Sequence, residues 1–159
     1  KLFGFEDFSG YEREIETFEE NSVKFINERR GGDFKSPADA IKKLIEIKNS
    51  DNLVAGNERA ILYEGNIQDI WDDFRNDNPG VRFSLACIDF NLYKPTSFIL
   101  KKISELIVKG GILVLRGYGV KPWEGESRAV DEFFENSNYK FTMKNIIYNN
   151  TPGAYLIKQ

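Results

Sequence analysis

Residues 81–96 read VRFSLACIDFNLYKPT and decide the fold, because an apolar run passes here into polar residues and then into a helix start. Residues 81–88 predict a strand, and their mostly apolar character is typical of a central parallel strand covered on both faces. Pro95 and Thr96 then begin a helix whose apolar residues recur with helical spacing. A strand followed by a helix is the repeating unit of an α/β sheet.

The same alternation extends to both sides of this stretch. Further strands are predicted at residues 2–5, 60–63, 112–115, 139–148 and 154–157. Helices are predicted from Ser36 and Pro37, from residue 67, and over residues 124–136, and the helix that begins at Pro95 should end at Gly110 and Gly111. The last two strands are joined by a short loop and predict an antiparallel hairpin. The expected fold is a doubly wound, mostly parallel α/β sheet with a C-terminal antiparallel hairpin, in one domain over residues 1–159.

Composition excludes several classes of function. Hydrophobic residues make up 41 % and charged residues 30 %, as in soluble globular proteins, and a net charge of −3 gives no basic surface for nucleic acid. No apolar run approaches the roughly 20 residues of a membrane span. The single cysteine, Cys87, lies in the predicted central strand as an inert small hydrophobe and fits a reducing, cytoplasmic setting. Histidine is absent, so acid–base chemistry must come from carboxylates, Lys, Tyr or Cys87.

Polar residues follow four of the predicted strands, where open α/β sheets bind ligands. They are Glu6 and Asp7, Gly65 and Asn66, Asp89 and Asn91, and Arg116, Gly117 and Tyr118. We expect these strand ends to lie along one edge of a single sheet. An early acid suits a ribose diol, and an Asn can bond an adenine edge as donor and acceptor. Alternatively, strand ends are polar simply because they meet solvent.

Three segments favour the ligand-binding interpretation. Residues 88–96 (IDFNLYKPT), 110–115 (GGILVL) and 123–133 (WEGESRAVDEF) resemble the macrocin O-methyltransferase family. That pattern runs roughly D-x-D-L-Y-x-[PS]-T, a helix, G-G-[IV] with apolar residues, an acidic pair, W-P-G and A-V-x-x-F. Residues 3–10 (FGFEDFSG) look like the family's second strand, and the likeness is weakest over residues 11–57. The resemblance implies a Rossmann-like class I fold that binds S-adenosylmethionine and methylates hydroxyls of sugars and glycosides, generally with a divalent cation.

The resemblance also assigns cofactor-binding positions. Glu6, with Asp7 beside it, falls where the family's ribose-binding acid sits, and Gly65 and Asn66 fall on its adenine-contacting element. Asp89 falls on the first acid of D-x-D and is expected near the cofactor as well.

The catalytic positions depart from the family's pattern. Asp89 matches a metal ligand, but Asn91 stands at the proposed general base and cannot accept a proton at neutral pH. Arg116 and Gly117 replace the acidic pair of the metal site. We therefore expect a degenerate site without a divalent metal, in which Arg116 pairs with Asp89 and keeps it ionised. Replacing Arg116 and Gly117 by Asp should create a metal site.

Aromatic residues near these positions are candidates for the acceptor pocket. Tyr93, Tyr118 and Trp123 could line it, although packing roles are equally compatible with their positions. Trp71 and Phe74 are expected in the core instead. The Glu-rich run at residues 12–20 is expected to be a solvated helix face or a mobile lid.

The family has a strand and a Gly-rich loop before its second strand, where this sequence begins. The sequence therefore predicts a fragment that binds S-adenosylmethionine weakly or not at all. The expected function is an O-methyltransferase homologue acting on a small sugar or glycoside acceptor, with a homo-oligomer compatible with the sequence. The alternatives are a non-catalytic relative that binds a nucleotide or glycoside, and an unrelated Rossmann-type protein such as a dehydrogenase domain. The absence of G-x-G-x-x-G disfavours the last of these.

Overall fold

The chain folds into two compact units. The computed structural model describes residues 1–10, 15–24, 37–51, 53–54, 56–136, 138–148 and 151–159. The first unit comprises Lys1–Gly10 and Asp33–Pro79, and the second comprises Tyr11–Gly32 and Gly80–Gln159. The described strands form a two-stranded sheet, β1-β2, and a four-stranded sheet, β3-β4-β6-β5. The expectation of one continuous sheet is therefore wrong for the described strands.

The first unit is a parallel strand pair with a helix on each face. β1 (Leu2–Glu6) pairs with β2 (Ala60–Glu64) from Leu2↔Ala60 to Glu6↔Glu64. α3 (Ile67–Asp77) packs on the aromatic face of the pair, where the Phe5 ring lies 5.0 Å from the Phe74 ring and 6.1 Å from the Trp71 ring. Trp71 and Phe74 are buried, which confirms their assignment to the core.

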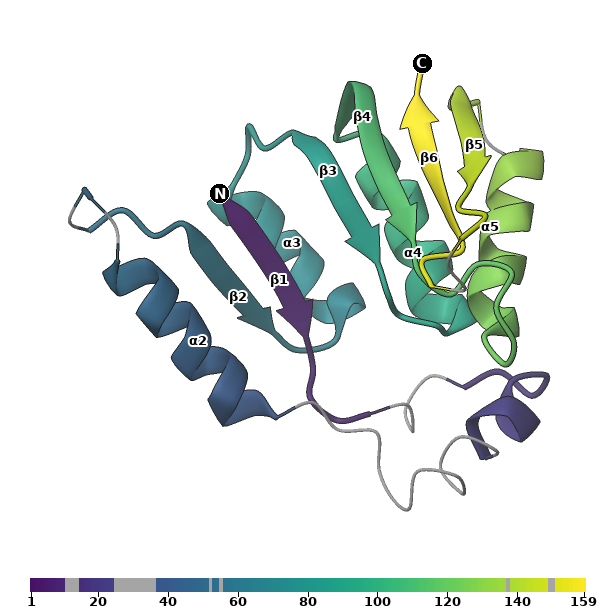
Figure 1. Cartoon of the computed structure of the whole chain (residues 1–159), viewed down its shortest axis with the longest axis horizontal. Helices are drawn as coiled ribbons and strands as arrows, with labels where there is room; N and C mark the ends of the chain where they lie inside the picture. Colours follow the sequence, from purple (N-terminus) through teal and green to yellow (C-terminus); the bar gives the residue numbers. More distant parts are fainter. Residues whose placement is uncertain (11–14, 25–36, 52, 55, 137, 149–150) are drawn as a thin grey trace. The chain divides into compact units, whose positions relative to one another are not determined.

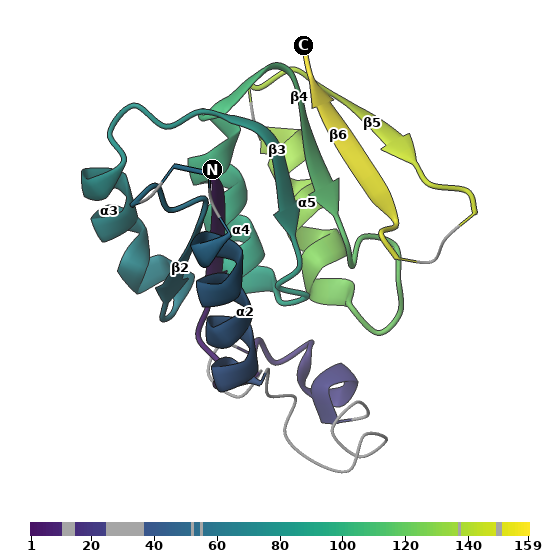
Figure 2. The same cartoon turned by 60° about the vertical axis from the view of Figure 1, so that its left-hand side comes forward.

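α2 (Ala38–Ser50) packs beside β2, on the side of the strand pair opposite α3 (Figures 1 and 2). Asn49 Nδ2 donates to the carbonyl of Ala60, and its Oδ1 accepts the N–H of Ala60. Pro37 precedes the helix as its N-cap residue, whereas Ser36 lies outside the described residues. Helices on both faces of parallel strands are the arrangement of doubly wound folds.

The second unit carries the four-stranded sheet and two helices on one of its faces (Figures 1 and 2). Its elements in chain order are β3 (Phe83–Ile88), α4 (Tyr93–Ser104), β4 (Ile107–Leu115), α5 (Glu124–Asn136), β5 (Phe141–Asn145) and β6 (Ala154–Lys158). β3 and β4 are parallel, and β6 runs antiparallel to both β4 and β5. The C-terminal antiparallel hairpin is thus present. α4 and α5 pack on each other over Leu113, Leu115 and Leu156, which are fully buried.

β3 is not the central, doubly covered strand that its composition predicts. It lies at the edge of its sheet. Ile88 is buried, but Leu85 is 62 % exposed and Cys87 is exposed. The apolar composition of β3 shows that its side chains are suited to burial, but it does not indicate which element would cover them. The described elements of this unit leave the Leu85 face open, so Cys87 is not the enclosed hydrophobe that we expected.

α4 ends earlier than the sequence predicts. The helix stops at Ser104, and Ile107 already belongs to β4. Lys158 Nζ donates to the carbonyls of Ser104 (2.7 Å) and Ile107 (2.8 Å), which binds acceptors left open where the helix ends. A short apolar run fits helix and strand periods equally well, so the sequence alone could not fix this boundary.

Gly110 and Gly111 mark a bulge inside β4 instead of a helix end. The register shifts between Phe83 and Leu85, and Gly110 has a φ of +76°. A Cβ on Gly111 would lie 2.8 Å from the carbonyl oxygen of Val108 and 3.1 Å from that of Phe83. Both contacts are to backbone, so a side chain at position 111 would force the strand to move.

None of the described helices is long and apolar enough to cross a membrane.

We expect Gly111→Ala to destabilise the fold by about 1–3 kcal/mol, because the added methyl group meets backbone atoms that cannot rotate away. Gly80→Ala is the matched control, since a Cβ there meets nothing within 4 Å. The control should stay within about 0.5 kcal/mol of the parent. Urea unfolding followed by circular dichroism measures both changes, and equal effects would contradict the bulge packing described here.

Candidate functional site

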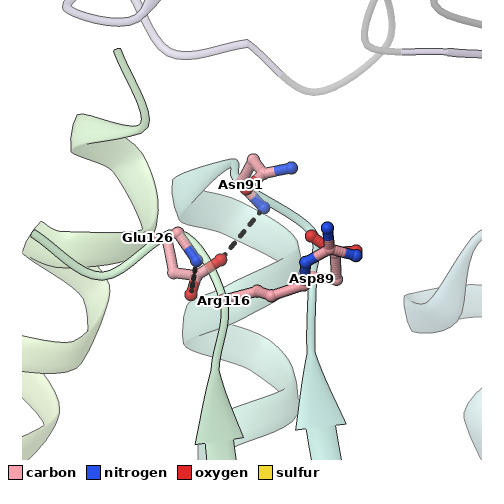
Figure 3. A network of polar contacts seen from close by, with 5 residues as sticks. Asp89, Asn91, Arg116 and Glu126 are labelled. Atoms are coloured by element: carbon pink, nitrogen blue, oxygen red, sulfur yellow. Dashed lines mark hydrogen bonds and ion pairs between the residues drawn. The ribbon is translucent and has the colours of Figure 1, made fainter. Parts of the chain in front are cut away.

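The parallel pairing of β3 with β4 brings two charged residues together at the carboxyl ends of the strands. Ile88 pairs with Leu115, so Asp89 and Arg116 follow at the same level. The N–H of Arg116 donates to the carbonyl of Ile88 at 3.0 Å. The Arg116 Nη1 and the Asp89 Oδ2 lie 2.9 Å apart, and Figure 3 shows the two side chains side by side. The ion pair expected between these residues is confirmed.

This ion pair does not keep the pKa of Asp89 low. Burial of the carboxyl group raises its pKa above the ordinary value, and this outweighs the opposing effects of Arg116 and of a hydrogen bond from Asn91. The side chains of Arg116 and Asp89 are 51 % and 45 % exposed, so solvent screens their attraction to about 1 kcal/mol or less. Arg116 acts in the expected direction, but the net shift of the Asp89 pKa is upward.

Asn91 occupies a sharp turn just beyond β3. Its φ is +63°, a left-handed conformation that Asn adopts more readily than most residues, and it is buried. Its backbone N–H donates to the carboxylate of Glu126, at 3.3 Å from Oε2. The Asn91 backbone therefore helps to shape the loop after β3.

Glu126 is a site residue that the sequence interpretation missed. It lies in the first turn of α5 with no exposed surface, and its Oε1 accepts the N–H of Gly117 at 2.7 Å (Figure 3). Burial raises the pKa of this carboxyl from 4.5 to about 7, despite the backbone N–H groups that stabilise its charge. A signal existed in the sequence: Glu126 shares the helical spacing of Ala129, Val130 and Phe133, which places it on the buried face of α5.

Glu19 is a second missed carboxylate. It is 2 % exposed, and its Oε1 accepts the N–H of Tyr93, the first residue of α4, at 2.9 Å. Leu92 at the N-cap position of α4 makes no side-chain cap, so Glu19 caps this helix from a distant part of the chain. Burial raises the pKa of Glu19. The expectation of a solvated Glu-rich run is therefore wrong at this position.

Gly125 makes room for the Glu19 carboxylate. A Cβ on Gly125 would lie 1.7 Å from Glu19 Oε1 and 2.6 Å from the nitrogen of Tyr93. Lys94 adds an ion pair with Glu16, with Lys94 Nζ 3.3 Å from Glu16 Oε1. Residues 15–24 are thus bound to the start of α4 and lie against the first turn of α5.

The three aromatic candidates for the acceptor pocket all contact other parts of the second unit. The Tyr93 hydroxyl donates to Glu132, and its ring lies 5.9 Å from that of Phe18. The Tyr118 hydroxyl donates to Asp131 at 2.9 Å. Trp123 is half-buried, and its N–H donates to the carbonyl of residue 120 at 2.8 Å. The hydroxyls of Tyr93 and Tyr118 are thus directed to α5.

The predicted cofactor-binding residues of the first unit lie at the ends of β1 and β2. Glu6 Oε1 accepts the N–H of Phe8 at 3.2 Å, and Asp7 Oδ1 accepts the N–H of Ser9 at 2.9 Å. The N–H of Gly65 donates to the carbonyl of Glu6 at 3.0 Å, so the ends of β1 and β2 are adjacent. Asn66 Oδ1 caps α3 by accepting the N–H of residue 68 at 2.8 Å.

Comparison with known proteins gives similarity in structure only. No protein-family model and no curated protein matches the sequence. A crystal structure of CalS11, a calicheamicin methyltransferase, matches with a TM-score of 0.77 at 19 % identity, over 99 % of this chain and 60 % of that one. The apo structure of CalS11, described as a TDP-rhamnose 3'-O-methyltransferase, matches with a TM-score of 0.68 at 20 % identity, over 99 % and 58 %. The structure of the O-methyltransferase NovP matches with a TM-score of 0.64 at 14 % identity, over 100 % of this chain and 60 % of that one.

The chain has the Rossmann-like α/β fold of these solved structures. It spans about three-fifths of the length of these solved structures. At identities of 20 % or less the likeness establishes the fold, and the chemistry has to be argued from the residues of the site.

We expect Glu126 to make the protein less stable as pH rises. Because its folded pKa of about 7 lies above its ordinary 4.5, the folded state holds this proton more tightly than the unfolded state. That contribution is fully present below about pH 4.5 and is lost as pH passes 7, which corresponds to roughly 2–3 kcal/mol between pH 5 and pH 8. Glu126→Gln should remove this part of the pH dependence, whereas Glu124→Gln, at an exposed site in the same turn, should not. Urea unfolding at several pH values measures the effect, and parallel curves for parent and Glu126→Gln would contradict it.

We expect Glu19→Ala to release residues 15–24 from α4, because the backbone N–H of Tyr93 loses its acceptor and a buried space opens beside Gly125. Amide hydrogen exchange in residues 15–24 should accelerate by about tenfold or more. Glu20→Ala is the control, since Glu20 is exposed in the same turn. Unchanged exchange in Glu19→Ala would show that other contacts hold this segment.

Proposed function

We propose that the chain is part of an S-adenosylmethionine-dependent O-methyltransferase, related to the macrocin O-methyltransferase family, that acts on a hydroxyl of a sugar or glycoside. The observation that carries the proposal is the convergence of Asp89, Asn91 and Arg116 at the carboxyl ends of β3 and β4, where α/β sheets bind ligands. The names of CalS11 and NovP as O-methyltransferases, one of TDP-rhamnose, favour a sugar acceptor.

The proposal treats residues 1–159 as one partial domain of a cytoplasmic enzyme with a small-molecule acceptor. It includes no nucleic-acid or membrane partner, and a homo-oligomer is compatible with it.

The strand ends of the first unit have the chemistry that the cofactor needs. The Glu6 carboxylate stands at the end of β1, and its oxygens can accept hydrogen bonds from a ribose diol, with Asp7 beside it. Gly65 has a φ of +140° next to it, which only glycine adopts readily. Asn66 already uses its side-chain oxygen to cap α3, so adenine recognition would rest on the backbone at Gly65 and Asn66. These residues would hold the nucleoside end of S-adenosylmethionine.

The residues at β3 and β4 do not fit a divalent metal ion. Among the described residues, no three acidic or cysteine side chains are grouped closely enough to hold one. Asp89 is paired with Arg116, and both oxygens of Glu126 accept backbone N–H groups. A cation beside Arg116 would meet a repulsion of roughly 4 kcal/mol at an effective dielectric near 20. The proposed reaction therefore proceeds without a metal.

Asp89 is the proposed proton acceptor of this site. When bound, S-adenosylmethionine supplies an electrophilic methyl group on a sulfonium. Asp89 would take the proton of the acceptor hydroxyl as the oxygen–methyl bond forms and the sulfur–methyl bond breaks, which leaves a neutral thioether. Its raised pKa makes Asp89 a stronger base than an ordinary carboxylate. Arg116 would hold Asp89 in place and orient the acceptor oxygen. Alignment of the two reactants supplies most of the rate. Tyr93, Tyr118 and Trp123 remain the proposed lining of the acceptor pocket.

Methyl transfer from labelled S-adenosylmethionine to nucleotide-linked and free deoxysugars tests the function. Asp89→Asn should lower the rate by at least about 100-fold, because the proton acceptor is lost. Asp73→Asn, at an exposed position in α3, is the control. Cofactor binding without transfer to any sugar would favour the non-catalytic alternative, for which Asn91 at the family's base position is the specific observation. Full activity of Asp89→Asn would contradict its role as base.

We expect the unmutated protein to show no stoichiometric Mg²⁺ or Ca²⁺ binding by titration calorimetry, and any methyl transfer to survive a chelator. The physical reason is the guanidinium of Arg116 beside the half-exposed carboxylate of Asp89. Asp89→Asn serves as the control, because binding that it abolishes would have to be at this site. A single metal ion bound at Asp89 would overturn the assignment of these positions.

A further inference from the structure

Glu126 occupies the space that a side chain at position 117 would take. A Cβ built on Gly117 would lie 3.0 Å from Glu126 Oε2, 3.2 Å from Glu126 Cδ and 2.7 Å from Asn91 Oδ1. These separations are shorter than ordinary van der Waals contact. A side chain at position 117 therefore requires the ends of the Asn91 and Glu126 side chains to move from the positions that they hold here.

The Glu126 carboxylate also ties together the two loops of the candidate site. Its oxygens accept one N–H from Asn91, two residues after Asp89, and one from Gly117, directly after Arg116. Figure 3 shows Glu126 reaching from α5 to the loops beyond β3 and β4. Since the two loops carry the two members of the ion pair, the contacts of Glu126 fix the backbone on both sides of that pair.

A charged carboxylate without exposed surface is costly to bury, and its hydrogen bonds must offset that cost. The charged group that acts on it here is Asp89, whose charge opposes its ionisation, while the backbone N–H groups of Gly117, Asn91 and Tyr118 favour it. Such an arrangement holds only while the donors keep their positions, so the carboxylate and the loops stabilise each other.

We propose that Glu126 is a positioning residue: it supplies from α5 the carboxylate that position 117 lacks, and it holds Asp89 and Arg116 together by binding the backbone of both loops. The importance of the Asp89–Arg116 pair for catalysis rests on the proposed function, but the coupling of Glu126 to that pair does not.

This arrangement leads to a prediction that differs from the one made from the sequence. Arg116→Asp with Gly117→Asp should not suffice to create a metal site, because a new carboxylate side chain at position 117 would collide with Glu126. The same pair combined with Glu126→Ala frees the space. Only the triple variant should bind Ca²⁺ stoichiometrically by titration calorimetry. Equal Ca²⁺ binding by the double and triple variants would contradict the exclusion.

A double-mutant cycle on the chain tests the exchange directly. Glu126→Ala and Gly117→Asp should each raise the unfolding equilibrium constant by about tenfold or more, the first through unpaired N–H groups and the second through the collision. For the variant with both changes, the unfolding equilibrium constant should be at least about tenfold smaller than the two single effects multiplied together would give. The reason is that the new carboxylate fills the vacated space. Glu124→Ala with Gly119→Asp, in the same helical turn and loop, is the control cycle and should be multiplicative. A multiplicative result for Glu126 and Gly117 overturns the proposal.

The side-chain NMR signal of Arg116 reports positioning, which a purely structural role would leave unchanged. In Glu126→Ala the guanidinium signal should move toward its position in Asp89→Asn, where the ion pair is absent. Glu126→Gln keeps an oxygen for Gly117 and should retain most of the parent signal, and this variant carries the test if the Ala variant does not fold. The proposal is overturned if folded Glu126→Ala keeps the parent Arg116 signal. It is also overturned if folded Glu126→Gln loses that signal. Failure of methyl transfer would leave both measurements intact and would bear only on the proposed function.

Discussion

The parallel pairing of β3 with β4 is the constraint on which the candidate site depends. Asp89 and Arg116 are 27 residues apart in the chain, and they meet because Ile88 and Leu115 are partners in the ladder. Parallel strands require a crossover between them, here α4, and the crossover places both strand ends at the same edge. Any shift of this register by one residue would turn one of the two side chains to the opposite face of the sheet. The bulge at Gly110 and Gly111 adjusts the length of β4 so that this pairing is kept.

Two buried carboxylates then fix the loops around that edge. Glu126 binds the loops that follow β3 and β4, and Glu19 binds the first turn of α4. In both places a glycine, Gly117 or Gly125, leaves the space that the carboxylate fills. A carboxylate that accepts two backbone N–H groups offsets part of its desolvation, and losing either partner would expose the full cost. The site is therefore built from pairs of residues that have to change together.

The strands and helices could be predicted from the sequence because apolar periodicity determines them locally. α5 has the predicted bounds, Glu124–Asn136, and each predicted strand overlaps a strand of the structure, although β4 begins earlier, at Ile107, and β5 is shorter than predicted. The errors arise where the pattern is compatible with two structures. Residues 103–107 (ISELI) suit the end of a helix or the start of a strand, and in the structure Lys158 binds the carbonyls of Ser104 and Ile107 at this boundary. The exposure of Leu85 depends on what covers β3, which no local pattern encodes.

The site was partly predictable for the same physical reason. Residues directly after strands are placed by strand geometry, and the family resemblance put Asp89 and Arg116 at one site, so their ion pair could be predicted. The direction of the Asp89 pKa did not follow, because it depends on how deeply the carboxyl is buried. Glu19 and Glu126 lie in charged stretches of sequence. Most glutamates in folded proteins are exposed to solvent, so the sequence favours an exposed position for both. Only the helical spacing of Glu126 with Val130 and of Glu19 with Val23 marks them as inward-facing.

Two acidic groups and one guanidinium lie at the edge of the second unit. Asp89 and Glu126 are both acidic, and the charge of Asp89 raises the pKa of Glu126 by repulsion. Arg116 compensates Asp89 directly, while Glu126 relies on backbone dipoles and not on a second positive side chain. A guanidinium is planar, permanently charged and covalently attached to the chain. A divalent metal ion, in contrast, needs several oxygen ligands around one point. Asn91 and Gly117 bring no carboxylate to the strand ends, so of the residues directly after β3 and β4 only Asp89 offers one, and Arg116 holds it.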